Sequence, residues 1–128
     1  MREFLFEDCN NNAGFLKKLF IEIQKFYSHD LIWEISNLDI LSLPQKDYIE
    51  GTRNPEIEKV YEFSVKVLNE HKVAVSNSCL LDILDYTKTI YYVDIVSNLD
   101  DGEIKIKIFD GNFITVYCDF EEKLLLTE

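Results

Sequence analysis

The 128-residue sequence predicts an α+β fold, in which about three helices pack on a four- to six-stranded, mainly antiparallel sheet with a C-terminal β-meander. Two segments repeat apolar residues at helical spacing, and the last third of the chain alternates apolar with polar residues as half-buried strands do. Hydrophobic residues make up 47% of the chain and aromatic residues 13%, which is enough material for a packed core. At this length a single domain over residues 1–128 is expected.

The N-terminal third predicts a short strand, a long helix and an extended segment. The apolar run Phe4–Phe6 favours a strand, and the asparagines at 10–12 can cap the helix that follows. A helix is expected over about residues 13–28, where the apolar side chains share one face: Phe15, Leu16, Leu19, Phe20, Ile23, Phe26 and Tyr27. Residues 30–43 alternate apolar and polar side chains and predict a strand, and residues 44–54 predict a polar loop.

The middle third predicts a second helix, a short strand and a short helix. Asn54 and Pro55 form a typical helix start, so a helix is expected over residues 55–71. Its buried face is expected to comprise Ile57, Val60, Tyr61, Ser64, Val67 and Leu68. A strand at 72–76 follows, and Ser78 is expected to cap a helix over 79–86. That short helix has an apolar face of Leu80, Ile83 and Leu84 and an opposite face of Asp82, Asp85 and Tyr86.

The C-terminal third predicts a β-meander. Residues 87–97 and 103–109 favour strands, with a turn at 98–102 between them. Asp110-Gly111 is a type I′ hairpin signal, and a two-residue turn there pairs residues whose numbers sum to 221. The expected pairs are Ile108 with Phe113, Ile106 with Thr115 and Ile104 with Tyr117, all six on one side of the sheet. Residues 119–128 suit either a last helical turn or an edge strand.

Residues suited to catalysis are scarce. No serine lies in a nucleophile elbow, and the four glycines form neither a phosphate-cradling loop nor a dinucleotide fingerprint. His29 and His71 fall near helix ends, where helix-terminus electrostatics account for both. Asp82 and Asp85 could form a catalytic carboxylate pair, but like charges on an exposed helix are usually solvated. No catalytic residue, no cofactor and no enzymatic activity are therefore expected.

Metal, redox and membrane motifs are also missing from the sequence. Cys9, Cys79 and Cys118 lack the spacing of a zinc or redox site, and Cys79 is expected to be a buried thiol. The turn at 100–103 lacks the alternating oxygen ligands of a calcium loop. No apolar run reaches the length of a membrane span, and the acidic N-terminus does not resemble a signal peptide. We expect no metal and a cytoplasmic location.

The strongest signal is the charge. The chain has 24 acidic against 13 basic residues, a formal charge of -11, which disfavours nucleic-acid binding and favours a basic protein partner. Residues 77–103 hold nearly half of the excess negative charge, because this segment contains six acidic residues and only one basic residue, Lys88. Tyrosines interleave with these carboxylates, a mixture suited to a protein-binding surface. The partner-binding residues are expected to be Asp82, Asp85, Tyr86, Asp100, Asp101 and Glu103.

In overall profile the chain resembles the immunity proteins encoded beside bacterial toxins, such as those of contact-dependent inhibition and other polymorphic toxin systems. The resemblance consists of one small domain, acid centred on residues 77–103, the lack of catalytic motifs, cytosolic character and an Ile/Asn/Lys-rich composition. It covers the whole chain but includes no diagnostic motif, so it assigns no residue roles. It implies that the protein binds a toxin domain, commonly a nuclease, and blocks its active site or its substrate groove.

Two other classes remain open. A DNA-mimic inhibitor or an adaptor would also be acidic, and its carboxylates would be spaced like phosphates along an extended surface. An enzyme or small-ligand domain would instead contain a deep pocket around His71 or Cys79.

Overall fold

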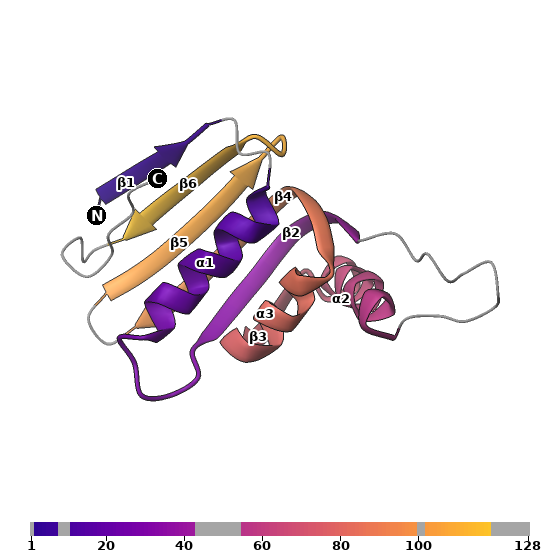
Figure 1. Ribbon diagram of the computed structural model, residues 1–128, viewed down its shortest axis with the longest axis horizontal. Helices are drawn as coiled ribbons and strands as arrows, with labels where there is room; N and C mark the ends of the chain where they lie inside the picture. The colour runs from indigo at the N-terminus through magenta and orange to yellow at the C-terminus, as the bar shows by residue number, and fades with distance from the viewer. Residues whose placement is uncertain (1, 8–10, 43–54, 100–101, 119–128) are drawn as a thin grey trace.

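The computed structural model describes residues 2–7, 11–42, 55–99 and 102–118 (Figure 1). In chain order the elements are β1 (Arg2–Phe6), α1 (Asn12–Gln24), β2 (Ile32–Ser42), α2 (Pro55–Glu70), β3 (Lys72–Ser76), α3 (Asn77–Asp85), β4 (Thr87–Leu99), β5 (Gly102–Phe109) and β6 (Phe113–Cys118). The strands form one antiparallel sheet in the order β1-β6-β5-β4-β2-β3. The predicted α+β fold is confirmed, including the antiparallel β4–β5–β6 meander.

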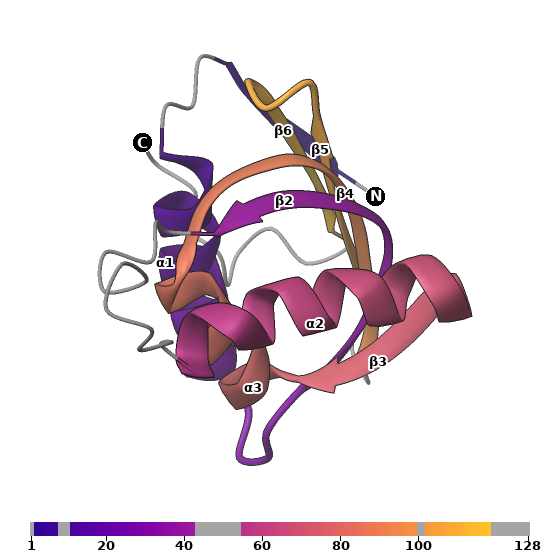
Figure 2. The ribbon, with the colours of Figure 1, turned by 90° about the vertical axis from the view of Figure 1, so that its right-hand side faces the viewer.

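The three helices all cover the same face of the sheet. Leu16 and Phe20 of α1, Val67 of α2 and Leu84 of α3 join one buried cluster with the inward side chains of the sheet. Figure 2 shows β2 and β4 curving over the helices. Among the described residues no helix packs on the opposite face, which we call the outer face. The result is a two-layer architecture whose sheet is covered on one side.

Register shifts at three points bend the long central strands β2 and β4. Between the pairs Ser36–Asp94 and Asp39–Tyr92, β2 contains one extra residue; between Asp39–Tyr92 and Ile40–Ile90, β4 contains the extra residue instead. Asn37, in the first bulge, has a left-handed φ of 52°. A third shift, between the pairs Leu41–Thr89 and Ser42–Thr87, adds another residue to β4. A bulge bends its strand and increases the local twist, so these irregularities place the curvature over the helices.

The first helix ends earlier than its apolar pattern predicts, at Gln24 instead of residue 28. The Gln24 side chain organises the turn that follows. Its Nε2 donates to the carbonyl of His29 at 2.6 Å, and its Oε1 accepts from the backbone N–H of Leu31 at 3.0 Å. This side chain thus satisfies two backbone groups of the turn between α1 and β2 and fixes the direction in which the chain enters β2.

The cap of α3 also differs from the prediction. The helix begins at Asn77, and the capping hydroxyl is that of Ser76, which accepts from the backbone N–H of Cys79 at 3.2 Å. Ser78 instead donates its hydroxyl to Asp30 at 2.6 Å. Cys79 lies on the exposed side of the helix, away from the buried Leu80, Ile83 and Leu84, so the expectation that this thiol is buried was wrong.

The register of the β5–β6 hairpin corrects a further prediction. The pairs are Ile108 with Ile114, Ile106 with Val116 and Ile104 with Cys118, so partner numbers sum to 222 and not 221. The turn has three residues, with Asp110 at φ 54° and Gly111 at φ 71°. A slip of one residue reverses which side chains of β6 are buried. The observed register buries Ile114, Val116 and Cys118 and turns Phe113, Thr115 and Tyr117 to the outer face.

The face of α2 that contacts the sheet is narrower than predicted. Ile57, Val60 and Val67 are buried as expected, but Tyr61 and Leu68 are 70% and 74% exposed. The helix ends at Glu70, and His71 follows with a left-handed φ of 68°. The predicted loop at 44–54 and the tail at 119–128 lie outside the described residues. Within the described ranges, no helix is long and apolar enough to cross a membrane.

Candidate partner-binding surfaces

The acidic surface of α3 has the local geometry that the sequence predicts. Leu80, Ile83 and Leu84 are buried, whereas Asp82 and Asp85 are exposed and Tyr86 is half-buried at the C-cap. The carboxylate of Asp85 forms an ion pair with Lys17 of α1. One of the two carboxylates is therefore already matched by a cation of the same chain, which reduces the net charge available to a partner.

Glu103 does not join this surface. It precedes the buried Ile104 on β5, and because neighbouring side chains of a strand point to opposite faces, Glu103 projects from the outer face. The helices, α3 among them, lie on the other face. Asp100 and Asp101 lie outside the described residues. The structure thus brings Asp82, Asp85 and Tyr86 together and places Glu103 on a different face of the molecule.

The outer face carries polar and apolar side chains in rows that cross the strands. One row runs through all six strands: Glu3, Tyr117, Lys105, Val96, Glu34 and Ala74. The neighbouring row consists of Leu5, Thr115, Lys107, Asp94, Ser36 and Lys72. Acids and lysines alternate along these two rows, so the centre of the outer face has a mixed charge.

The end of the outer face at the β5–β6 turn is different, because three aromatic residues lie there side by side. Phe109 and Phe113 are direct cross-strand partners, and the ring of Tyr92 contacts that of Phe109 edge-on with centroids 5.6 Å apart. The exposed fractions are 63% for Phe109, 40% for Tyr92 and 38% for Phe113. We call these three residues the aromatic row.

Carboxylates surround the aromatic row. Asp39 pairs with Tyr92 across β2 and β4, Asp94 is the next outward residue of β4, and Asp110 directly follows Phe109. Asp94 accepts a hydrogen bond of 2.6 Å from the Asn37 side chain and lies 3.9 Å from the ammonium of Lys107. Asp39 and Asp110 have no ion pair within the described part of the chain. The surroundings of the aromatic row are therefore negative overall.

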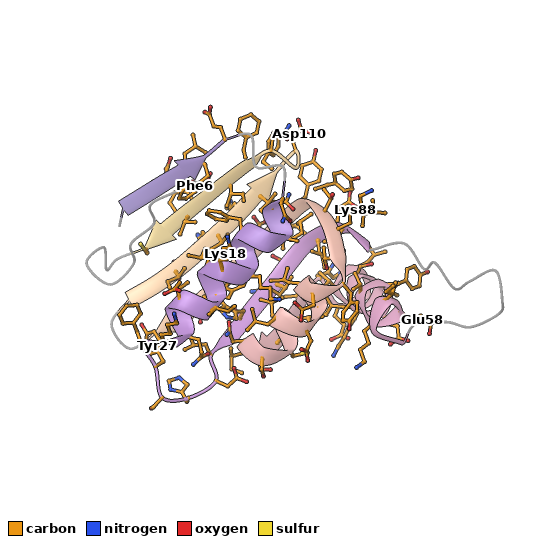
Figure 3. The ribbon with its side chains drawn as sticks, in the orientation of Figure 1. Phe6, Lys18, Tyr27, Glu58, Lys88 and Asp110 are labelled. Atoms are coloured by element: carbon orange, nitrogen blue, oxygen red, sulfur yellow. The ribbon has the colours of Figure 1, made fainter. Side chains whose placement is uncertain are left out.

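A buried asparagine fixes the aromatic row against the helical layer. Asn12, the first residue of α1, is 1% exposed and bonds both backbone groups of Ile90, accepting from its N–H at 3.0 Å and donating to its carbonyl at 2.6 Å. It also donates to the carbonyl of Gly111 at 3.0 Å. Figure 3 shows Asp110 at the turn between β5 and β6, close to the start of α1. One side chain thus joins α1, the β4 bulge and the hairpin turn.

The aromatic row was not predicted from the sequence, because it depends on the registers of two strand pairs, β5 with β6 and β4 with β5. With the pairing expected from a two-residue turn, Phe113 would have lain inward opposite Ile108. The signal for the true register was the run Ile114, Val116 and Cys118, which is more apolar than Phe113, Thr115 and Tyr117. Tyr92 and Phe109 could be assigned to strands, but their contact depends on the register of β4 against β5, which pairs Val93 with Ile108.

An apolar cavity of about 20 Å³ lies between the three helices and the sheet. Its lining includes Phe20, Leu38, Phe63, Leu84 and Ile90. A drug-sized ligand needs roughly 300 Å³ or more, so this cavity is a packing defect and not a ligand site. Within the described ranges, no group of three His, Cys, Asp or Glu side chains is arranged to hold a metal ion.

Comparisons of this chain with protein-family models, with curated proteins and with solved structures find no match.

Proposed function

We propose that this protein is a small acidic binding protein that acts in the cytoplasm and neutralises a basic protein partner. The partner is a cognate toxin domain, and a nuclease fits best. In this proposal the protein has the role of the immunity proteins that it resembles in profile, and it acts by stoichiometric binding without catalysis.

The observation that carries the proposal is the outer face, on which no helix of the described residues packs and where the aromatic row lies among carboxylates. Exposed apolar groups that lie together mark interaction sites, and aromatic residues are enriched in protein interfaces. A formal charge of -11 accelerates encounter with a cationic surface and suppresses association with an anionic one. The two features together favour a basic protein as the partner.

A nuclease suits this chemistry because its substrate groove is built for phosphates. Lysine and arginine side chains that contact a nucleic-acid backbone can accept carboxylates in place of phosphates. Binding in or beside the groove would exclude the nucleic acid. The DNA-mimic alternative receives less support, because Lys105 and Lys107 lie between the carboxylates of the outer face and break the phosphate-like pattern.

The test uses the product of the gene adjacent to the one encoding this chain. The product is expressed in a bacterial host with and without this protein, and growth and copurification are measured. We expect toxicity from the product alone, rescue by this protein, a stable complex and an affinity that falls as salt concentration rises. Binding to nucleic acid in place of the product, or growth inhibition that this protein does not relieve, would overturn the proposal.

A further inference from the structure

We propose that the aromatic row is the anchor of partner binding, and that its occupant is an apolar patch flanked by arginine or lysine on the basic partner. This inference rests on the proposed function and assigns the contact to the outer face. It moves the contact away from the acidic surface of α3.

The outer face exposes more apolar area than the α3 surface does. Phe109, Tyr92 and Phe113 expose rings that meet edge to face or lie directly opposite each other, and Leu5 of β1 and Leu41 of β2 are 54% and 44% exposed on the same face. Burying an aromatic side chain contributes strongly to an interface, and such residues dominate the binding energy when they lie at its centre. The α3 surface has no comparable group, because Tyr86 is half-buried.

The carboxylates around the aromatic row complement a basic partner. Asp39, Asp94 and Asp110 border the aromatic row on three sides, whereas Lys107 is the basic residue that the strand pairing places beside it. A partner that packs an apolar group on the rings would bring its flanking cations against these carboxylates. Each surface has one carboxylate with a lysine of the same chain, Asp85 with Lys17 on α3 and Asp94 with Lys107 on the outer face, but Asp39 and Asp110 beside the aromatic row have no ion pair within the described residues. The basic occupant is thus better matched by the outer face.

The strands that carry the aromatic row are held in place by buried and cross-strand hydrogen bonds. Asn12 ties the hairpin turn and the β4 bulge to α1, and Asn37 holds Asp94 from the neighbouring strand. Side chains that are already ordered lose less conformational entropy on binding. The aromatic row is therefore presented on regular strands in a fixed geometry.

The experiment compares matched variants for binding to a catalytically inactive form of the adjacent gene product. Phe109→Ser removes the most exposed ring of the aromatic row, and Leu68→Ser removes an equally exposed apolar side chain from α2 as its control. We expect Phe109→Ser to weaken the affinity about 30-fold or more and Leu68→Ser to leave it within about twofold.

A second pair of variants separates local from long-range charge. Asp39→Asn with Asp110→Asn and Asp82→Asn with Asp85→Asn each remove two negative charges, so the net charge of the two proteins is the same. Asparagine also tolerates the left-handed backbone of residue 110. We expect the first pair to weaken binding at least about tenfold and to reduce its salt dependence more than the second pair.

Hydrogen exchange of the wild-type complex provides a readout without substitutions. Protection on binding is expected over residues 89–94 and 107–115 and not over residues 77–86. If the wild-type protein binds but protection and affinity loss both fall on α3, the outer-face assignment is overturned while the proposed function survives. If the wild-type protein does not bind the product at all, the proposed function fails, and this inference fails with it.

Discussion

The acidic surface of α3 and the aromatic row of the outer face differ in what holds their residues together. The α3 surface follows from helical spacing, because Asp82 and Asp85 are three residues apart on the side opposite Leu80 and Leu84. The aromatic row follows from strand pairing, since Tyr92, Phe109 and Phe113 come from three strands. The acidic surface of α3, in the most charge-rich segment of this sequence, is therefore not the surface with the most exposed aromatic area.

The two regions also differ in how many of their side chains have partners within the same chain. On α3, Asp85 has Lys17 as a partner, and Asp30 bonds both the backbone N–H and the hydroxyl of Ser78 at the start of the helix. At the aromatic row, the rings contact one another but remain substantially exposed. A binding partner would therefore bury this exposed apolar area. Substitutions that affect one region and not the other can separate their roles.

The largest effect is expected from Asn12→Ala, which removes three hydrogen bonds to buried or half-buried backbone groups. Leaving such groups unsatisfied should lower the free energy of unfolding by about 3 kcal/mol. Denaturant unfolding measures this loss. The neighbouring cap variant Asn11→Ala, which loses one exposed bond to Gly14, should cost about 1 kcal/mol. Equal losses in the two variants would contradict the role assigned to Asn12.

A smaller loss is expected from Trp33→Phe, which acts on the α3 side of the molecule. The indole N–H donates to Oδ1 of the buried Asn77 at 2.9 Å, so the variant leaves that oxygen without its donor. The free energy of unfolding should fall by about 2 kcal/mol, and hydrogen exchange should accelerate in residues 77–85. If exchange accelerates equally around the aromatic row, the two regions unfold together and are not energetically independent.

The smallest effect is expected from Lys17→Ala, which frees Asp85 from its ion pair. Because both side chains are about 40% exposed, the pair should contribute no more than about 0.5 kcal/mol to stability. The informative measurement is the affinity for a basic partner. A partner that docks on α3 would bind the variant more tightly, whereas a partner on the aromatic row would bind it as it binds the wild-type protein.

The element types were predictable because their patterns are local. The helical spacing of apolar residues predicts α1 and α2, and the alternation around Ile104, Ile106 and Ile108 predicts β5. Neither prediction requires knowing which elements pack or pair with these segments. The strand at 72–76 and the α3 faces were also correct. These features depend on side chains within a few residues of each other, which is the range at which sequence patterns are informative.

The errors concern choices between near-equivalent local options. Ser76 and Ser78 can both cap a helix, and the bond between Ser78 and Asp30, far away in the chain, decides between them. Asp110-Gly111 suits a two-residue turn, but burying Ile114 and Val116 instead of Phe113 and Thr115 selects a three-residue turn. Tyr61 and Leu68 have the spacing of a core stripe, yet they lie beyond the width of the contact with β2. The candidate site was missed for the same reason.

The pairing of β1 with β6 has a consequence for biosynthesis. Residues 2–6 leave the ribosome first among the described strands, but their partner strand, residues 113–118, follows more than a hundred positions later. Residues 2–6 can therefore pair only after residues 113–118 have been synthesised. A contact of such long range closes slowly, so β1 should join the sheet after the local β4–β5 and β5–β6 hairpins have formed.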